Sequence, residues 1–256
     1  MFFDTHAHYD DERFDGDRDA VLSGLAAAGV SYVINAGSDV GSSLESRELA
    51  SRYKFIYYAA GFHPHCAADA PDDVEDALAP FFCGEKAVAV GEIGLDYHYD
   101  FSPRERQKEV FSRQLDFARR AGAPAIIHNR EADGDAVDIV RPYARAGLRG
   151  VFHCFSGGRE LAKQVLDMGF YIAFGGSLTF KNAHALREAA AYAPADRLLI
   201  ETDCPYMAPV PFRGRRNDSS LIRYVAERVA SIKNMDTDET ARITGENAKT
   251  LFSITR

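Results

Sequence analysis

The feature that most constrains the fold of this chain is a series of eight short apolar runs spread along its 256 residues. Each run is apolar on both faces, as strands buried in a parallel sheet are. The expected strands are Phe2–His6, Tyr32–Ala36, Phe55–Gly61, Ala87–Gly91, Ala125–His128, Gly150–Phe155, Tyr171–Phe174 and Leu198–Thr202.

Segments with helical spacing lie between the expected strands. Ala136, Ile139, Val140 and Tyr143 follow the i, i+3, i+4, i+7 pattern of an amphipathic helix, for example. This alternation predicts a parallel α/β fold, and eight units without a break predict a closed (β/α)8 TIM barrel, with an open doubly wound sheet as the alternative. The length is close to that of one such barrel. No linker or low-complexity tract interrupts it, so we expect residues 1–256 to form a single domain.

Composition limits the kind of partner and the compartment. Lys and Arg number 30 against 38 Asp and Glu, a formal charge of −8, which excludes a protein that grips nucleic acid by a globally basic surface. The four cysteines form no CxxC pair, which favours reduced thiols over a disulfide framework. The first residues lack the pattern of a signal peptide, and no apolar run approaches the length of a membrane helix. We therefore expect a cytoplasmic protein with no membrane segment.

Residues that commonly bind metals stand at or just past the ends of several expected strands. The motif His6-Ala7-His8 places two imidazoles on the same side of the first strand, which alone is a weak signal. Because the C-terminal ends of barrel strands converge on one face, where barrel active sites lie, the further residues strengthen it. The full set is His6, His8, Glu92, His128, His153 and Asp203.

Four nitrogen donors and two carboxylates are more than one tetrahedral zinc needs, so we expect two divalent cations. The expected division puts His6, His8 and Asp203 on one cation and His128 and His153 on the other, with Glu92 as a bridge. A water between two such cations loses a proton near neutral pH and becomes the nucleophile, and Asp203 is placed to accept that proton or to orient the hydroxide. Zn²⁺, Mn²⁺ and Mg²⁺ all remain candidates.

Four other residues have two interpretations each. His63 and His65 follow the third strand and either contact substrate or belong to a loop beside a rigid turn. Arg130, two residues past His128, either binds an anionic substrate group or forms a surface ion pair. Glu201 shares the strand face of Asp203, so it either orients the metal ligands or makes a buried structural hydrogen bond.

The densest positive cluster is residues 212–217, which follow the last strand. Arg213 within it is a candidate contact for a substrate phosphate, since a guanidinium offers a bidentate fork, although a solvated loop explains the cluster equally well. Cys154 and Cys204 stand next to expected ligands, but strand alternation turns them away from the metal face. We do not count these two cysteines as ligands.

With these residues in view, the chain resembles the TatD family of metal-dependent hydrolases from end to end. The departure from the family pattern is small: Asn129-Arg130-Glu131 stands where members often have Ser-Arg-Asp or Ser-Arg-Glu. The matching segments, specific only in combination, are Asp4-Thr5-His6-Ala7-His8, Gly61-Phe62-His63-Pro64-His65, Gly91-Glu92-Ile93-Gly94-Leu95-Asp96-Tyr97, His128-Asn129-Arg130, Phe152-His153-Cys154-Phe155-Ser156-Gly157, Thr179-Phe180-Lys181-Asn182, Glu201-Thr202-Asp203-Cys204-Pro205-Tyr206 and Arg213-Gly214.

The resemblance implies a TIM-type barrel, two divalent cations and phosphodiester hydrolysis of the deoxyribonuclease kind, with 3′-to-5′ exonuclease activity in some members. The metal ligands of the family correspond to the six residues identified above, and its substrate contacts correspond to His63, His65 and Arg130. A related group bridges its metals through a carboxylated lysine, and Glu92 at that strand position argues against membership of that group.

Three functions remain in competition at this point. The leading hypothesis is a metal-dependent nuclease acting on DNA, at single-stranded ends, with no obligate protein partner. The second keeps the metal centre but cleaves an ester or amide, for example an aminoacyl ester on tRNA, because the same nucleophile serves both reactions. The third is a protein that binds metal or nucleic acid without turnover, against which the intact ligand set argues.

Overall fold

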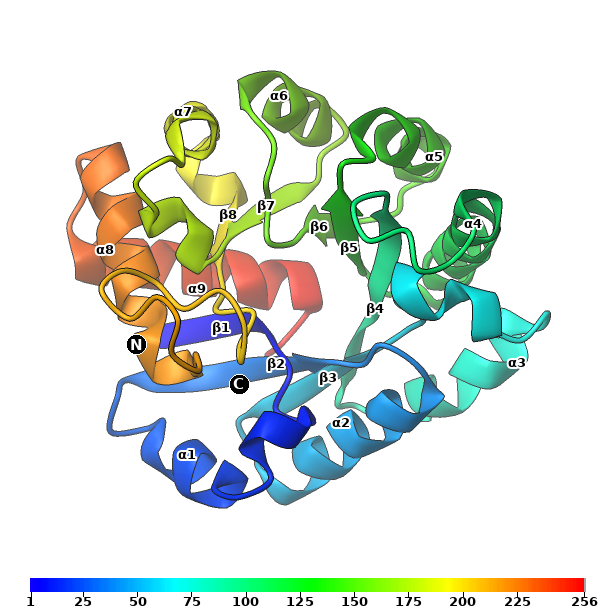
Figure 1. Ribbon diagram of the computed structural model, residues 1–256, viewed down its shortest axis with the longest axis horizontal. Helices are drawn as coiled ribbons and strands as arrows, with labels where there is room; N and C mark the ends of the chain where they lie inside the picture. Colours follow the sequence, from blue (N-terminus) through cyan, green and yellow to red (C-terminus); the bar gives the residue numbers. More distant parts are fainter. Residues whose placement is uncertain (256) are drawn as a thin grey trace.

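The computed structural model describes residues 1–255, and its eight parallel strands form one sheet in chain order (Figure 1). Short apolar runs form these strands because each is buried on both faces, against the barrel interior and against the surrounding helices. The strands are β1 (Phe2–Ala7), β2 (Val30–Ala36), β3 (Ile56–Ala60), β4 (Ala87–Asp96), β5 (Ala125–Arg130), β6 (Gly150–Phe152), β7 (Tyr171–Phe174) and β8 (Leu198–Ile200).

Hydrogen bonds bring the first strand together with the segment that follows the last. The backbone N–H of His8 donates to the carbonyl of Cys204 at 2.7 Å, and the N–H of Asp203 donates to the carbonyl of His6 at 2.9 Å. A parallel bridge joins Ala7 and Cys204. These contacts close the sheet, so the predicted TIM barrel is confirmed and the open sheet is excluded.

Helices surround the barrel on its outer side (Figure 1). Local signals fix some of their ends: Asp39 caps α2 by accepting the N–H of Ser42 at 2.8 Å, and Gly122 ends α4 in the left-handed conformation. The helices are α1 (Arg18–Gly24), α2 (Val40–Arg52), α3 (Val74–Leu78), α4 (Arg104–Ala121), α5 (Asp133–Arg145), α6 (Arg159–Asp167), α7 (His184–Tyr192), α8 (Ile222–Lys233) and α9 (Thr237–Phe252).

Short 3₁₀ turns punctuate the connections at Glu12–Phe14, Pro64–Asp69, Ala79–Cys83, Gly176–Thr179, Ala195–Arg197 and Ser219–Leu221. Within residues 1–255, each helix is too short or too polar to cross a bilayer.

Two apolar clusters stabilise the barrel, and the position of the smaller one limits a polar site to one end of the barrel interior. It contains buried side chains from all eight strands, such as Ile126, Val151 and Leu199, so it must fill the barrel interior. Leu251 and Phe252 of α9 belong to the same cluster and cover one end of the barrel. The apolar filling at that end leaves the other end of the interior for polar side chains.

The alternation of side chains along each strand explains this division of the barrel interior into an apolar end and a polar end. Residues two apart in a strand point to the same face, so Ile126 and His128 share a face, as do Val151 and His153. The apolar member of each pair joins the interior cluster, and the histidine lies one step nearer the C-terminal end. The sequence therefore builds an apolar floor with polar side chains above it.

The strand boundaries differ from expectation mainly at β4, β6 and β8. Strand β4 continues to Asp96 rather than ending at Gly91, while β6 and β8 end earlier than predicted, at Phe152 and Ile200. The extension of β4 depends on Gly94, whose φ is 148° and where a Cβ atom would lie 1.9 Å from the carbonyl oxygen of His128. Glycine lets β4 and β5 approach closely beside the candidate site.

Candidate metal centre

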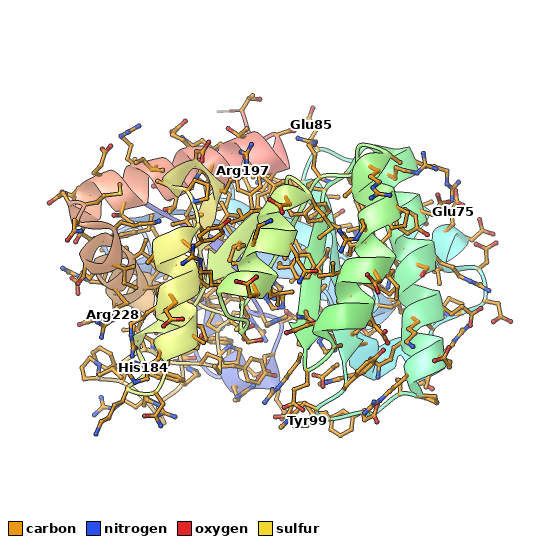
Figure 2. All side chains as sticks on the ribbon, turned by 90° about the horizontal axis from the view of Figure 1, so that it is seen from above. Glu75, Glu85, Tyr99, His184, Arg197 and Arg228 are labelled. Atoms are coloured by element: carbon orange, nitrogen blue, oxygen red, sulfur yellow. The ribbon has the colours of Figure 1, made fainter. Side chains whose placement is uncertain are left out.

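The predicted ligands meet at one end of the barrel, in or beside a cavity of about 680 Å³. Figure 2 shows the two ends of the barrel: Tyr99, which lines the cavity, lies at the opposite end from Glu85 and Arg197, which precede β4 and β8. The C-terminal strand ends therefore carry the cavity, as expected for a barrel of this type.

One group of donor atoms comes from β1 and from the segment after β8. Nε2 of His6 lies 3.0 Å from Nε2 of His8, and Oε2 of Glu92 lies 3.2 Å from the first and 3.5 Å from the second. Oδ1 of Asp203 lies 3.5 Å from Nε2 of His8 and 3.9 Å from Nε2 of His6. These atoms can hold one divalent cation.

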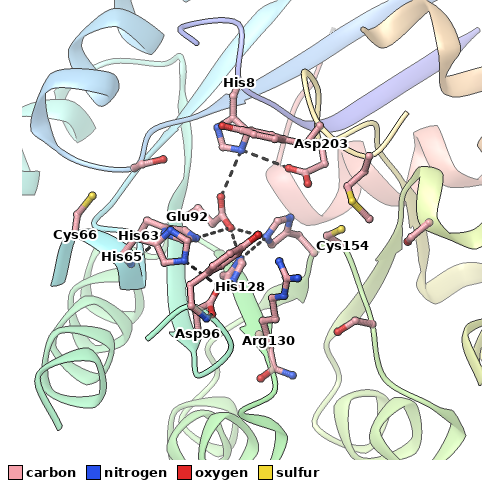
Figure 3. Close-up of a pocket in the computed structure, with 18 of the residues that line it drawn as sticks. His8, His63, His65, Cys66, Glu92, Asp96, His128, Arg130, Cys154 and Asp203 are labelled. Carbon is pink, nitrogen blue, oxygen red and sulfur yellow. Dashed lines mark hydrogen bonds and ion pairs between the residues drawn. The ribbon is translucent and has the colours of Figure 1, made fainter. Parts of the chain in front are cut away.

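A second group gathers around the other oxygen of Glu92. Its Oε1 lies 2.6 Å from Nδ1 of His128, 2.7 Å from Nε2 of His153 and 3.3 Å from Nε2 of His63. Glu92 thus lies between the two groups and offers a different oxygen to each (Figure 3). This is the geometry that a bridging carboxylate requires.

The separations between the donors lie around those expected for metal coordination. Donors held at about 2.1 Å from one cation lie about 3.0–3.4 Å from one another, and the separations here run from 2.6 Å to 3.9 Å. The orientation of the His8 ring also fits. Nδ1 of His8 lies 3.0 Å from the carbonyl oxygen of Ala36, which can only accept, so Nδ1 carries a proton and Nε2 is the ring atom that faces the other donors.

The electrostatics of the centre favour added positive charge. Burial alone would raise the pKa of Glu92, but electrostatic interactions with the imidazoles of His153, His63 and His6 outweigh it and hold that pKa well below its usual range. Burial opposes protonation of His8, yet the carboxylates of Asp203 and Glu92 raise its pKa to about 9. Buried carboxylates that stay ionised beside imidazoles are suited to binding cations.

Asp96 supports the second group from behind, a role that the sequence analysis did not assign. Its Oδ2 lies 3.0 Å from Nε2 of His65 and 3.1 Å from Nε2 of His128. It therefore fixes the His128 ring with Nδ1 toward Glu92. The signal available in the sequence was spacing, because Glu92 and Asp96 lie four residues apart on what proves to be one strand.

Glu201 lies at the ring nitrogen of His153 that faces away from Glu92. It is fully buried, its Oε1 accepts the backbone N–H of Cys154, and the same oxygen lies 3.5 Å from Nδ1 of His153. Among residues 1–255, Oε2 of Glu201 and Nδ1 of both His6 and His153 have no hydrogen-bond partner. A role in orienting these imidazoles remains a prediction.

The expected substrate contacts separate into different places. His63 is buried beside Glu92, and burial lowers its pKa to about 4, so its neutral imidazole belongs with the donor atoms rather than at the mouth. His65 and Arg130 line the cavity, and in Figure 3 the Arg130 side chain reaches toward its centre. Arg213 does not line it, and its guanidinium lies 4.1 Å from the Phe180 ring centroid instead.

The basic segment 212–217 is largely engaged in local structure. Arg216 pairs with Asp17 at 2.6 Å, and the buried Asn217 donates to the carbonyl of Thr202 at 2.8 Å. Burial raises the pKa of the thiols of Cys154 and Cys204, which disfavours the thiolate form that a metal would need.

A TIM barrel with histidine and carboxylate donors gathered at its C-terminal end defines the class of this protein as a metal-dependent hydrolase with an amidohydrolase-like fold. Its particular family is shown by sequence. The family model described as "TatD related DNase" matches residues 3–253, and the chain belongs to the TatD family.

Relatives and solved structures agree over the whole length. The chain is 46% identical to the uncharacterized metal-dependent hydrolase YabD of Bacillus subtilis, covering 99% of this chain and 100% of that one. It is 34% identical to the 3′-5′ ssDNA/RNA exonuclease TatD of Citrobacter koseri, with 98% and 99% covered. The crystal structure of YJJV, a TatD homologue from Escherichia coli, superposes with a TM-score of 0.93 at 32% identity, covering 99% and 98%.

Proposed function

We propose that this protein is a divalent-metal-dependent phosphodiesterase that removes nucleotides from the ends of single-stranded nucleic acid, in the 3′-to-5′ direction. The observation that carries the proposal is the meeting of two donor groups on the two oxygens of Glu92. We further propose that the centre holds two cations, with His6, His8 and Asp203 at one, His128 and His153 at the other, and Glu92 between them.

Each cation, when bound, would neutralise a phosphate oxygen and lower the pKa of a water molecule. The other contributions to the reaction would come from protein side chains placed around the centre. The buried ring of His63 packs beside Glu92 at the wall of the cavity. Asp203 faces the cavity with its side chain 15% exposed, so its carboxylate can accept the proton that the attacking water gives up.

Arg130 supplies the contact for the substrate phosphate. It makes no ion pair with any residue in 1–255, and it lines the cavity, so its guanidinium is free for a ligand. One local cation and the metals can hold a phosphodiester even though the chain carries a net charge of −8. The names of relatives from Citrobacter koseri and Salmonella typhimurium as ssDNA/RNA exonucleases support the choice of a nucleic-acid end.

The proposal is tested with Glu92→Gln and Asp203→Asn, each purified with its metal content measured. Both variants should melt as cooperatively as the wild type and should degrade a 5′-labelled single-stranded oligonucleotide at least about 100-fold more slowly. The matched control is Asp138→Asn on the outer surface of α5, where the carboxylate's one ion pair within residues 1–255 is with Arg141, at 3.9 Å.

The same panel should include carboxylic esters, lactones and aminoacyl-tRNA. Cleavage of these substrates with no attack on phosphodiesters would replace the nuclease by a deacylase that uses the same centre. Wild-type rates of DNA degradation in either variant would refute the assignment of Glu92 and Asp203.

A further inference from the structure

Two exposed aromatic rings stand at the mouth of the cavity, on the segment between β4 and α4. Tyr99 and Phe101 are 48% and 67% exposed, and both line the cavity. Their rings stack on each other, with centroids 5.3 Å apart and planes 24° apart. Large apolar side chains left open to water beside a candidate active site indicate a surface that binds a ligand. We call these two residues the aromatic ledge.

The ledge is connected to the metal donors through a single histidine. The ring of His65 meets Tyr99 edge-on at 5.4 Å and Phe101 at 4.8 Å. The Nε2 atom of the same imidazole lies 3.0 Å from Oδ2 of Asp96, which also binds His128. A ligand on the ledge would therefore lie one side chain away from the residues that hold the second donor group.

A cation lies against the ledge. The guanidinium of Arg130 lies 4.7 Å from the Tyr99 ring centroid, and it has no ion-pair partner among residues 1–255. A nucleotide presents a flat base and a negative phosphate a few bonds apart. The ledge and Arg130 offer a flat apolar surface and a positive charge next to each other, so the two parts of one nucleotide have complementary groups side by side.

The other aromatic side chain at the mouth is already engaged. Tyr206 donates its hydroxyl to Asp11 at 2.9 Å, and Arg13 lies 4.1 Å over its ring. Arg13 in turn binds the same carboxylate at 2.8 Å. These contacts occupy one face and the polar edge of Tyr206, whereas the Phe101 ring of the ledge, 67% exposed, is the more open stacking surface.

We propose that the aromatic ledge binds an unpaired nucleobase of the strand whose phosphate lies at the metal centre. This inference rests on the proposed function and names the part of the substrate that the ledge recognises. A base inside a duplex has both faces covered by its neighbours, so the ledge can take a base only from a single strand or a frayed end. Stacking is tolerant of sequence because every base has such a face.

The direct test uses a single-stranded oligonucleotide with 2-aminopurine near its 3′ end and phosphorothioate linkages that resist cleavage. Stacking on an aromatic ring should quench the fluorescence of the wild-type complex. Phe101→Ala should weaken binding by about 5- to 150-fold and remove most of the quenching, and Phe101→Tyr should restore both. Tyr192→Ala is the matched control, since Tyr192 is 38% exposed and does not line the cavity.

A second measurement uses cleavable strands that carry abasic residues in place of the terminal bases. Abasic substitution should raise KM for the wild type by the same factor as Phe101→Ala raises it for the normal strand. The KM of Phe101→Ala for the abasic strand should be no higher than the KM measured with either change alone, because each change removes the same stacking contact.

The results distinguish a failure of the ledge proposal from a failure of the nuclease proposal. If the wild type cleaves strands but Phe101→Ala leaves affinity and quenching unchanged, the ledge proposal is wrong and the nuclease proposal stands. If the wild type cleaves no phosphodiester, the nuclease proposal fails, and quenching that depends on Phe101 would still support a base-binding ledge. Equal binding of a blunt duplex and a single strand would also overturn the ledge proposal.

Discussion

Replacing Asp96 by asparagine exchanges one carboxylate oxygen for an amide nitrogen and should weaken metal binding by the second donor group, which contains His128. The carboxylate has no spare acceptor: Oδ1 accepts the backbone N–H groups of His98 at 3.0 Å and Tyr99 at 2.8 Å, and Oδ2 lies within 3.1 Å of His65 and His128. An amide nitrogen in either position would face two donors instead of accepting from them. Either the loop or the two imidazoles must then lose their partner.

The size of the effect follows from these contacts. Burial would raise the pKa of Asp96, but the hydrogen bonds of His128 and Tyr99 hold it well below its usual range, so the residue acts as an anion. Loss of a carboxylate that orients a metal-binding imidazole costs about 10- to 100-fold in metal affinity or activity. We expect a loss in that range for Asp96→Asn, measured by competition against a chelator of known affinity.

A control separates the metal effect from general destabilisation. Asp135→Asn alters a half-exposed carboxylate that accepts from the Tyr97 hydroxyl at 2.6 Å and pairs with Lys108 at 2.9 Å, contacts worth about 0–1 kcal/mol at the surface. It should leave metal affinity unchanged. Metal affinity within twofold of the wild type in Asp96→Asn, at equal thermal stability, would refute the reasoning.

Two further predictions concern the substrate contact and the close approach of β4 and β5. Arg130→Ala should raise KM for a short oligonucleotide by about 10- to 100-fold with little change in melting temperature, because its guanidinium makes no ion pair within residues 1–255. The control Arg213→Ala, outside the cavity, should change KM less than about threefold. A larger change in KM for Arg213→Ala than for Arg130→Ala would refute the assignment. Gly94→Ala should destabilise the protein by at least about 3 kcal/mol, since its Cβ would meet the carbonyl of His128 at 1.9 Å. Calorimetry should show a melting temperature lower by about 6 °C or more, and an unchanged value would contradict the close approach of β4 and β5.

Much of the fold could be predicted because each strand carries its own signal. Buried parallel strands are apolar on both faces, so Ala87–Val90 or Leu198–Ile200 can be recognised without knowing their neighbours. Barrel geometry then brings strand ends together, which is why His6 and Asp203, far apart in sequence, could be placed at one site. The division of donors over the two oxygens of Glu92 supports the predicted bridge, which stays a prediction until metals are located.

The remaining features depend on contacts that no local pattern records. Asp96 gains its role from His65 and His128, which come from other parts of the chain. His63 packs among the donors because of where the β3 connection turns, whereas its motif left it between a substrate contact and a loop beside a rigid turn. The path of the segment after β8 carries Arg213 away from the cavity, where composition had left two interpretations open.

The most direct test of the central claim is anomalous scattering from crystals grown with Mn²⁺ or Zn²⁺. We expect two peaks about 3.5–4 Å apart, one beside His6, His8 and Asp203 and the other beside His128 and His153, each next to a different oxygen of Glu92. A single peak at full occupancy, or two peaks that do not share Glu92, would contradict the claim.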